Sequence, residues 1–191
     1  MADISAAAVK ELRERTGAGF MDCKRALQET DGDIDKAIAL LRERGVAAAE
    51  KRSGREAREG LISSYIHTGG RVGVLIEVNC ETDFVARTDD FQKLVRDLAI
   101  QVAGLAPQYV QREDVPESAI EAKRQELGGD ARTSGDVESH LNRWLKEVVL
   151  LDQPFRDTNQ SVRDLITNAV ATIGENIRVR RFVRFALGED V

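Results

Sequence analysis

The chain has 191 residues, and its 42% hydrophobic and 32% charged residues are typical of a globular protein with one or two cores. A net charge of −5 and a pI near 5.2 exclude a general polyanion binder, which needs a broad positive field. No apolar run approaches the ~20 residues that cross a bilayer, and the first residues lack the layout of a secretory signal, so we expect a cytoplasmic protein without membrane or direct nucleic-acid contacts.

Residues 1–53 are predicted to form a module of three short helices. Ser5 is placed to cap the first helix, which the glycine pair in Thr16–Gly19 ends. Apolar residues with helical spacing define the next two helices: Cys23, Ala26 and Leu27, then Ile34, Ala37, Ile38 and Leu41. We expect the third helix to end before Gly45, and residues 46–60, which have no wide apolar face, to form a linker.

Phe20 and Met21 follow the glycine loop of this module, and two interpretations of them are open. They either form an exposed hydrophobic loop that docks on a partner, or fold under the bundle as part of its core.

Residues 54–191 are predicted to form a second module that opens with a β-hairpin. A strand over 61–67 turns at Thr68–Gly70, and the next strand, 71–80, has apolar residues at alternate positions. With the helices that follow, this makes the chain an α+β protein: a helical bundle, then an antiparallel sheet packed with helices.

The second strand leads into the segment Glu81–Ala86, where a carboxylate and an aromatic ring stand side by side on a connection between two rigid elements. Thr88 is placed to cap the helix that comes next. Two interpretations of the segment are open. Asp83 and Phe84 either face a partner, or Thr82 or Asp83 caps a short turn while Phe84 and Val85 fill the core.

Three further helices and a final strand complete the prediction. The helices are one over 116–127, one that follows residues 134–136 and includes Val148, and one that Ser161 caps and that ends before Gly174; the strand spans 176–187. On the final strand we expect one apolar face and one basic face, formed respectively by Ile177, Val179, Val183, Phe185, Leu187 and by Arg178, Arg180, Arg184. In an acidic chain, these arginines favour a solvated face or the rim of a protein contact over an RNA-binding stripe.

Only two cysteines occur, Cys23 and Cys80, without a CxxC or Cys/His spacing, so we predict buried thiols and neither a metal site nor a cofactor. A hydrolase that uses Cys80, His67 or His140, and Asp83 is disfavoured, because no oxyanion loop accompanies them.

Five segments together resemble the signatures of a known family. They are Thr16–Gly19, Met21–Leu27, Gly32–Asp33, Val78–Arg87 and Leu151–Phe155. In this order, they resemble bacterial elongation factor Ts over essentially the whole chain, in its short form with a single αβ core.

The resemblance implies a guanine nucleotide exchange factor that binds elongation factor Tu in its GDP and nucleotide-free forms and performs no covalent chemistry. It implies that the bundle, similar to ubiquitin-associated domains, docks through Phe20 and Met21, although the family usually has methionine at position 20. It also implies that Thr82, Asp83, Phe84 and Val85 displace Mg²⁺ from the GTPase. The short form further implies that 54–191 is both core and dimerisation domain, with a homodimer seam along the final strand.

A different class of function also fits the pattern. In it, the chain is a non-catalytic adaptor whose bundle binds a ubiquitin-like or helical partner. An adaptor would leave GDP release from any GTPase unchanged.

Overall fold

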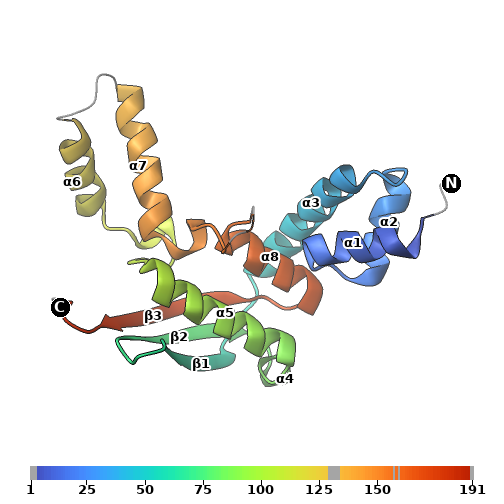
Figure 1. Ribbon diagram of the computed structural model, residues 1–191, viewed down its shortest axis with the longest axis horizontal. Helices are drawn as coiled ribbons and strands as arrows, with labels where there is room; N and C mark the ends of the chain where they lie inside the picture. The colour runs from blue at the N-terminus through green and yellow to red at the C-terminus, as the bar shows by residue number, and fades with distance from the viewer. Residues whose placement is uncertain (1–3, 129–133, 157, 159, 190–191) are drawn as a thin grey trace. The chain divides into compact units, whose positions relative to one another are not determined.

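The computed structural model describes residues 4–128, 134–156, 158 and 160–189, which form an α+β fold as the sequence predicts (Figure 1). In chain order the elements are α1 (Ala6–Thr16), α2 (Phe20–Glu29), α3 (Ile34–Ser53), β1 (Glu59–Ile66), β2 (Val72–Cys80), α4 (Asp83–Ala86), α5 (Asp89–Leu105), α6 (Glu117–Gly128), α7 (Ser134–Val148), α8 (Val162–Ile173) and β3 (Arg178–Ala186). Two compact units are formed by different parts of the chain: a first unit of Met1–Gly60, Asn79–Phe91 and Asp164–Arg178, and a second unit of Leu61–Val78, Gln92–Arg163 and Val179–Val191.

The first unit contains the three-helix bundle α1–α3 (Figure 1). The Ser5 hydroxyl caps α1 by accepting from the Ala8 amide at 3.2 Å, and Gly17 ends the helix with a left-handed φ of 70°. Predicted apolar positions of α2 and α3 join residues of α1 in the bundle core, whose buried members are Val9, Leu12, Cys23, Ala26, Leu27 and Ala37.

The third helix is longer than predicted, because α3 continues through Gly45 to Ser53. Gly45 is buried, and a Cβ at this position would lie 3.7 Å from atoms of Thr167 and Asn168 on α8. Arg42, one turn earlier, pairs with Asp164 of α8 at 2.9 Å. Packing on α8 and the helix-forming residues after Gly45 therefore outweigh the weak helix propensity of a single glycine.

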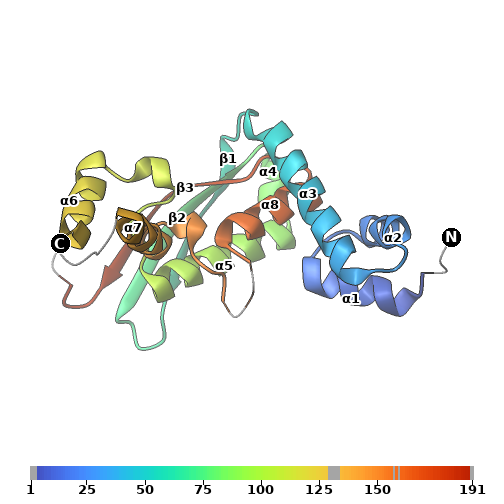
Figure 2. The same cartoon turned by 90° about the horizontal axis from the view of Figure 1, so that it is seen from above.

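The second unit contains most of the antiparallel sheet, whose strand order is β1-β2-β3. The predicted hairpin is present, with Gly69 and Gly70 at positive φ in its turn. On β2, the side chains of Val74, Ile76 and Val78 alternate inward, as predicted. The helix α5 lies along this face of the sheet (Figure 2), and the Arg184 guanidinium donates to the Ala103 carbonyl near the end of that helix.

The same unit contains a helical hairpin of α6 and α7, which lie side by side in both views (Figures 1 and 2). Its core consists of Val115, Leu141, Leu145, Val148 and Val149. This small core holds the two helices together.

The predicted faces of the last strand are wrong beyond Arg180. Val179 is buried, but Val183 and Phe185 are exposed, and the Arg184 side chain is only 16% exposed. Arg180 and Arg181 are both exposed and both pair with Glu77 of β2, at 3.5 and 2.8 Å. The two ion pairs and the change in burial after Arg180 together indicate a β-bulge, which moves every later side chain to the other face.

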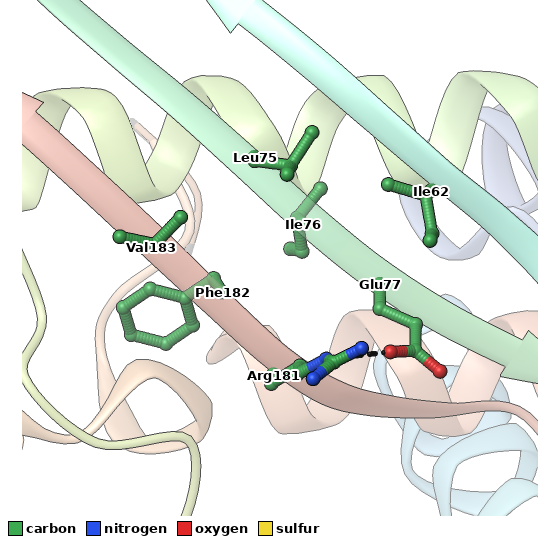
Figure 3. A pocket seen from close by; sticks show the side chains of 7 residues that line it. All are labelled: Ile62, Leu75, Ile76, Glu77, Arg181, Phe182 and Val183. Atoms are coloured by element: carbon green, nitrogen blue, oxygen red, sulfur yellow. Dashed lines mark hydrogen bonds and ion pairs between the residues drawn. The ribbon is translucent and has the colours of Figure 1, made fainter.

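This shift leaves the second face of the sheet apolar. Exposed large side chains come from all three strands: Ile62, Ile66, Leu75, Val183 and Phe185. Three of them line a shallow hollow bordered by the Glu77–Arg181 ion pair (Figure 3). We call these five residues the open sheet face.

Candidate functional site

The corner that follows β2 is a capped turn. The strand ends at Cys80, and the Thr82 hydroxyl accepts from the Val85 amide at 3.3 Å, which starts the single-turn helix α4. The Thr88 hydroxyl in turn accepts from the Phe91 amide at 3.4 Å at the start of α5. The corner thus lies between a strand and a long helix, and the starts of α4 and α5 each have a threonine hydroxyl as a cap.

The residues of the turn have opposite surroundings. Phe84 is 77% exposed, whereas Val85 is 8% exposed and packs inward with Ala86. The Asp83 carboxylate is exposed and accepts from the Arg87 guanidinium at 2.7 Å, one helical turn away. The turn therefore presents a ring and an acid to solvent, while Val85 anchors it.

Thr82, Asp83, Phe84 and Val85 thus lie together as a contiguous group. Both sequence interpretations contain part of this arrangement, because Thr82 caps, Val85 is buried and Phe84 points outward. Exposure of the ring makes the turn a candidate protein-contact site.

A carboxylate that the sequence did not single out holds this corner. Glu175 lies between α8 and β3, and its Oε2 accepts from the backbone amides of Glu81 and Thr82 at 3.0 and 3.1 Å. Its Oε1 accepts from the Thr82 hydroxyl at 2.7 Å. The sequence signal was only a polar residue after Gly174, which gave no indication of a contact 93 residues away.

The thiol of Cys80 adjoins the corner and donates to the Thr82 carbonyl at 3.1 Å. Burial, and then the negative charge of Glu175, raise the pKa of this thiol to about 11. A thiol that stays protonated near neutral pH is a poor nucleophile. The two histidines are bonded elsewhere, His67 to the Tyr65 hydroxyl and His140 to the Asp136 carbonyl, so the hydrolase interpretation gains no support.

Phe20 and Met21 form a second exposed apolar group in the first unit. They are 51% and 58% exposed. They lie in the first turn of α2 rather than on the predicted loop, because Gly19 is already the N-cap. A helix fixes the direction of both side chains more firmly than a loop would, and neither is part of the bundle core.

Among the residues that the structure describes, no group of three or more His, Cys, Asp or Glu is arranged to hold a metal ion. In the same part of the chain, no helix is long and apolar enough to cross a membrane.

Comparison with known proteins identifies the family. The family model described as "Elongation factor TS" matches residues 6–189. Relatives named "Elongation factor Ts" include one from Carboxydothermus hydrogenoformans, 55% identical over 98% of this chain and 91% of its own length. Another, from Synechococcus elongatus, is 56% identical over 100% of this chain and 91% of its own, and one from Coprothermobacter proteolyticus is 54% identical over 98% and 100%.

The chain belongs to the elongation factor Ts family. This confirms the resemblance inferred from the five sequence segments and places the chain among translation elongation factors. The chain also spans 91–100% of the length of these three elongation factor Ts relatives, so these relatives are similar to it in length.

Proposed function

We propose that this chain is the guanine nucleotide exchange factor of elongation factor Tu. In this proposal it binds the GTPase in its GDP form, displaces Mg²⁺ and promotes release of GDP, so that GTP can bind. The observation that carries the proposal is the exposed ring of Phe84 on a capped, anchored turn in a member of the elongation factor Ts family.

The mechanism needs no covalent step. Mg²⁺ bound to a nucleoside diphosphate is held by few protein ligands, so a small shift of the elements that carry them weakens both ion and nucleotide. Phe84 acts as a wedge between elements of the partner, and Asp83 supplies a polar contact beside it. The buried Val85 side chain and the Thr82 cap hold Phe84 in position when its ring packs against the partner.

Exchange is then a coupling of two binding equilibria. If the factor binds nucleotide-free GTPase more tightly than the GDP form, it must weaken GDP binding by the same ratio. Binding energy is converted into faster GDP release, and excess GTP completes the cycle.

Phe20 and Met21 supply the second contact of the proposal. In the proposal, the module 1–53 docks on elongation factor Tu, and the core 54–191 carries the Phe84 wedge. Two exposed apolar groups on separate elements are consistent with this division, because each offers a rigid anchor of its own.

Release of fluorescently labelled GDP from elongation factor Tu, chased with unlabelled nucleotide, tests the proposal. The wild-type chain is expected to accelerate release, and Phe84→Ala to lower the rate about 30-fold, the effect of losing an interface hot spot of roughly 2 kcal/mol. Leu105→Ala is the matched control, since Leu105 is 49% exposed on α5 and outside the proposed contacts.

Far-UV circular dichroism establishes that the variants are folded. If wild-type protein binds elongation factor Tu but leaves GDP release unchanged, the adaptor function is correct and the exchange proposal fails. If Phe84→Ala accelerates release as well as Leu105→Ala does, the ring is not the wedge.

We also propose that two copies associate through the core. The open sheet face and the neighbouring edge of β3 offer a self-complementary surface for a two-fold dimer. Soluble monomers rarely leave large apolar side chains exposed across three adjacent strands, since the solvent face of an antiparallel sheet is normally polar.

A further inference from the structure

We propose that Glu175 and Asn176 are positioning residues that hold the Phe84 turn in its working orientation and tie it to the end of α3. This inference rests on the exchange function proposed above. The two residues bond to Glu81 and Thr82, just before the turn, so they act on Phe84 through the Thr82 cap.

The first half of the contact fixes the start of the turn. Both oxygens of the Glu175 carboxylate are used: Oε2 accepts from the Glu81 and Thr82 amides, and Oε1 accepts from the Thr82 hydroxyl. Because that hydroxyl gives its hydrogen to Glu175, its lone pairs are available to the Val85 amide. Glu175 thus orients the cap that begins α4 just before Phe84.

The second half is the reciprocal contact. Glu81 Oε1 accepts from the Asn176 amide at 2.6 Å and lies 3.5 Å from the Arg55 guanidinium. Each of the two chain segments therefore gives a carboxylate to the backbone of the other. Such crossed, charge-assisted bonds resist rotation of the turn about the end of β2.

The contact extends to the end of the bundle's longest helix. The Asn176 side chain, which is buried, donates to the carbonyls of Ser53 and Arg55 at 3.3 and 2.7 Å. The Arg52 guanidinium donates to the Gly174 carbonyl at 3.0 Å. The C-terminal end of α3 and the Phe84 turn are thus fixed to the same short segment, 174–176.

Segment 174–176 does more than connect α8 to β3, because it bonds to both the corner and the end of α3. Glu175 accepts from the residue that caps the wedge, while Gly174 and the Asn176 side chain bond to the end of the helix that leads from the docking module. When Phe84 contacts the partner, the hydrogen bonds from Val85 to Thr82 and from Thr82 to Glu175 connect the turn to the α8–β3 connection, and they prevent the corner from bending. Glu175 should therefore affect the rate of GDP release from the bound complex more than the affinity of docking.

The test measures GDP release from elongation factor Tu against the concentration of the full-length factor, which separates the maximal rate from the half-saturating concentration. Glu175→Ala is expected to lower the maximal rate about tenfold and to change the half-saturating concentration less than twofold. Thr82→Val, which keeps the shape and removes the hydroxyl, is expected to act similarly, and Thr82→Ser to restore most of the lost rate.

The double variant Glu175→Ala/Thr82→Val tests whether the two residues lower the rate of GDP release through the same cap. It is expected to be no slower than the slower single variant, because both changes remove the same cap. Glu121→Ala is the matched control, since this exposed carboxylate lies on α6 in the second unit and accepts from the side chains of Arg124 and Gln125.

The inference is overturned if folded Glu175→Ala retains the wild-type maximal rate, or if its effect and that of Thr82→Val multiply in the double variant. Should Glu175→Ala not fold, Glu175→Gln replaces it, since the amide keeps one acceptor oxygen and loses the charge; an unchanged maximal rate in that variant also overturns the inference. Failure of the exchange function itself is distinct, because the wild-type chain would then not accelerate GDP release at all.

Discussion

Cys80 is a buried thiol whose surroundings oppose its ionisation. Burial and the Glu175 carboxylate raise its pKa from 9.0 to about 11 in the folded chain. An unfolded chain lacks both influences and loses this proton near pH 9. Folding therefore retains a proton on Cys80 between pH 9 and about 11, and over that interval the free energy of unfolding falls as pH rises.

Replacing this thiol should change the pH dependence of stability. We expect the free energy of unfolding of Cys80→Ala to fall less steeply than that of the wild type between pH 9 and about 11, since the substitution removes the titrating group. Urea unfolding followed by circular dichroism at several pH values in that interval measures both slopes. Parallel slopes for the two proteins would contradict the assignment.

The sequence alone could not decide which of Phe84 and Val85 is buried at the corner. Consecutive helical residues point about 100° apart, so one can be buried while the next is exposed. A four-residue helix has no periodicity from which to decide which of the two faces inward. The Thr82 cap could be predicted from residue type, but the contact with Glu175 depends on the tertiary fold.

At the scale of elements, α3 continues through Gly45 because its packing against α8 favours one straight helix. The closest atoms to a Cβ at position 45 lie at 3.7 Å, an ordinary contact distance. We therefore expect Gly45→Ala to stabilise the chain by about 1 kcal/mol through helix propensity. Gly45→Leu should destabilise it by roughly 1–3 kcal/mol, since the longer side chain meets Thr167 and Asn168.

Gly104 is the matched position for this prediction. It also lies in a helix, α5, but a Cβ there would meet no atom within 4 Å. Gly104→Leu should therefore be tolerated. Chemical denaturation of the variants measures the differences, and equal effects of Gly45→Leu and Gly104→Leu would show that α8 does not restrict position 45.

The helices were largely predictable because caps and apolar spacing are local signals, as Ser5 and Gly17 show for α1. The faces of β3 were not, because a single inserted residue reverses the alternation. The only local sign was the adjacent pair Arg180–Arg181, which interrupts strict alternation of polar and apolar residues. Recognising the bulge required knowing that both arginines meet Glu77.

At the scale of the whole molecule, the bulge has a consequence for association. By turning Val183 and Phe185 to the face that carries Leu75, it completes the open sheet face. Ile66 adds to this face from β1, where its Cδ1 would lie 3.0 Å from a Cβ at Gly73. The absence of a side chain on Gly73 thus lets Ile66 lie against the sheet, where it extends the apolar surface that a second copy would cover.

A single charged substitution in the open sheet face should prevent this association. We expect the wild-type chain to sediment at micromolar concentration with about twice its mass of 21.1 kDa, and Phe185→Glu to sediment as a monomer. Phe185 is 66% exposed, so the substitution has little effect on the fold of the single chain, whereas a carboxylate buried between two copies would lack a partner. Phe20→Glu is the matched control, because Phe20 is similarly exposed but lies in the bundle, and it should remain dimeric. A monomeric wild type, or a Phe185→Glu variant with wild-type sedimentation, would contradict association of two copies through the open sheet face.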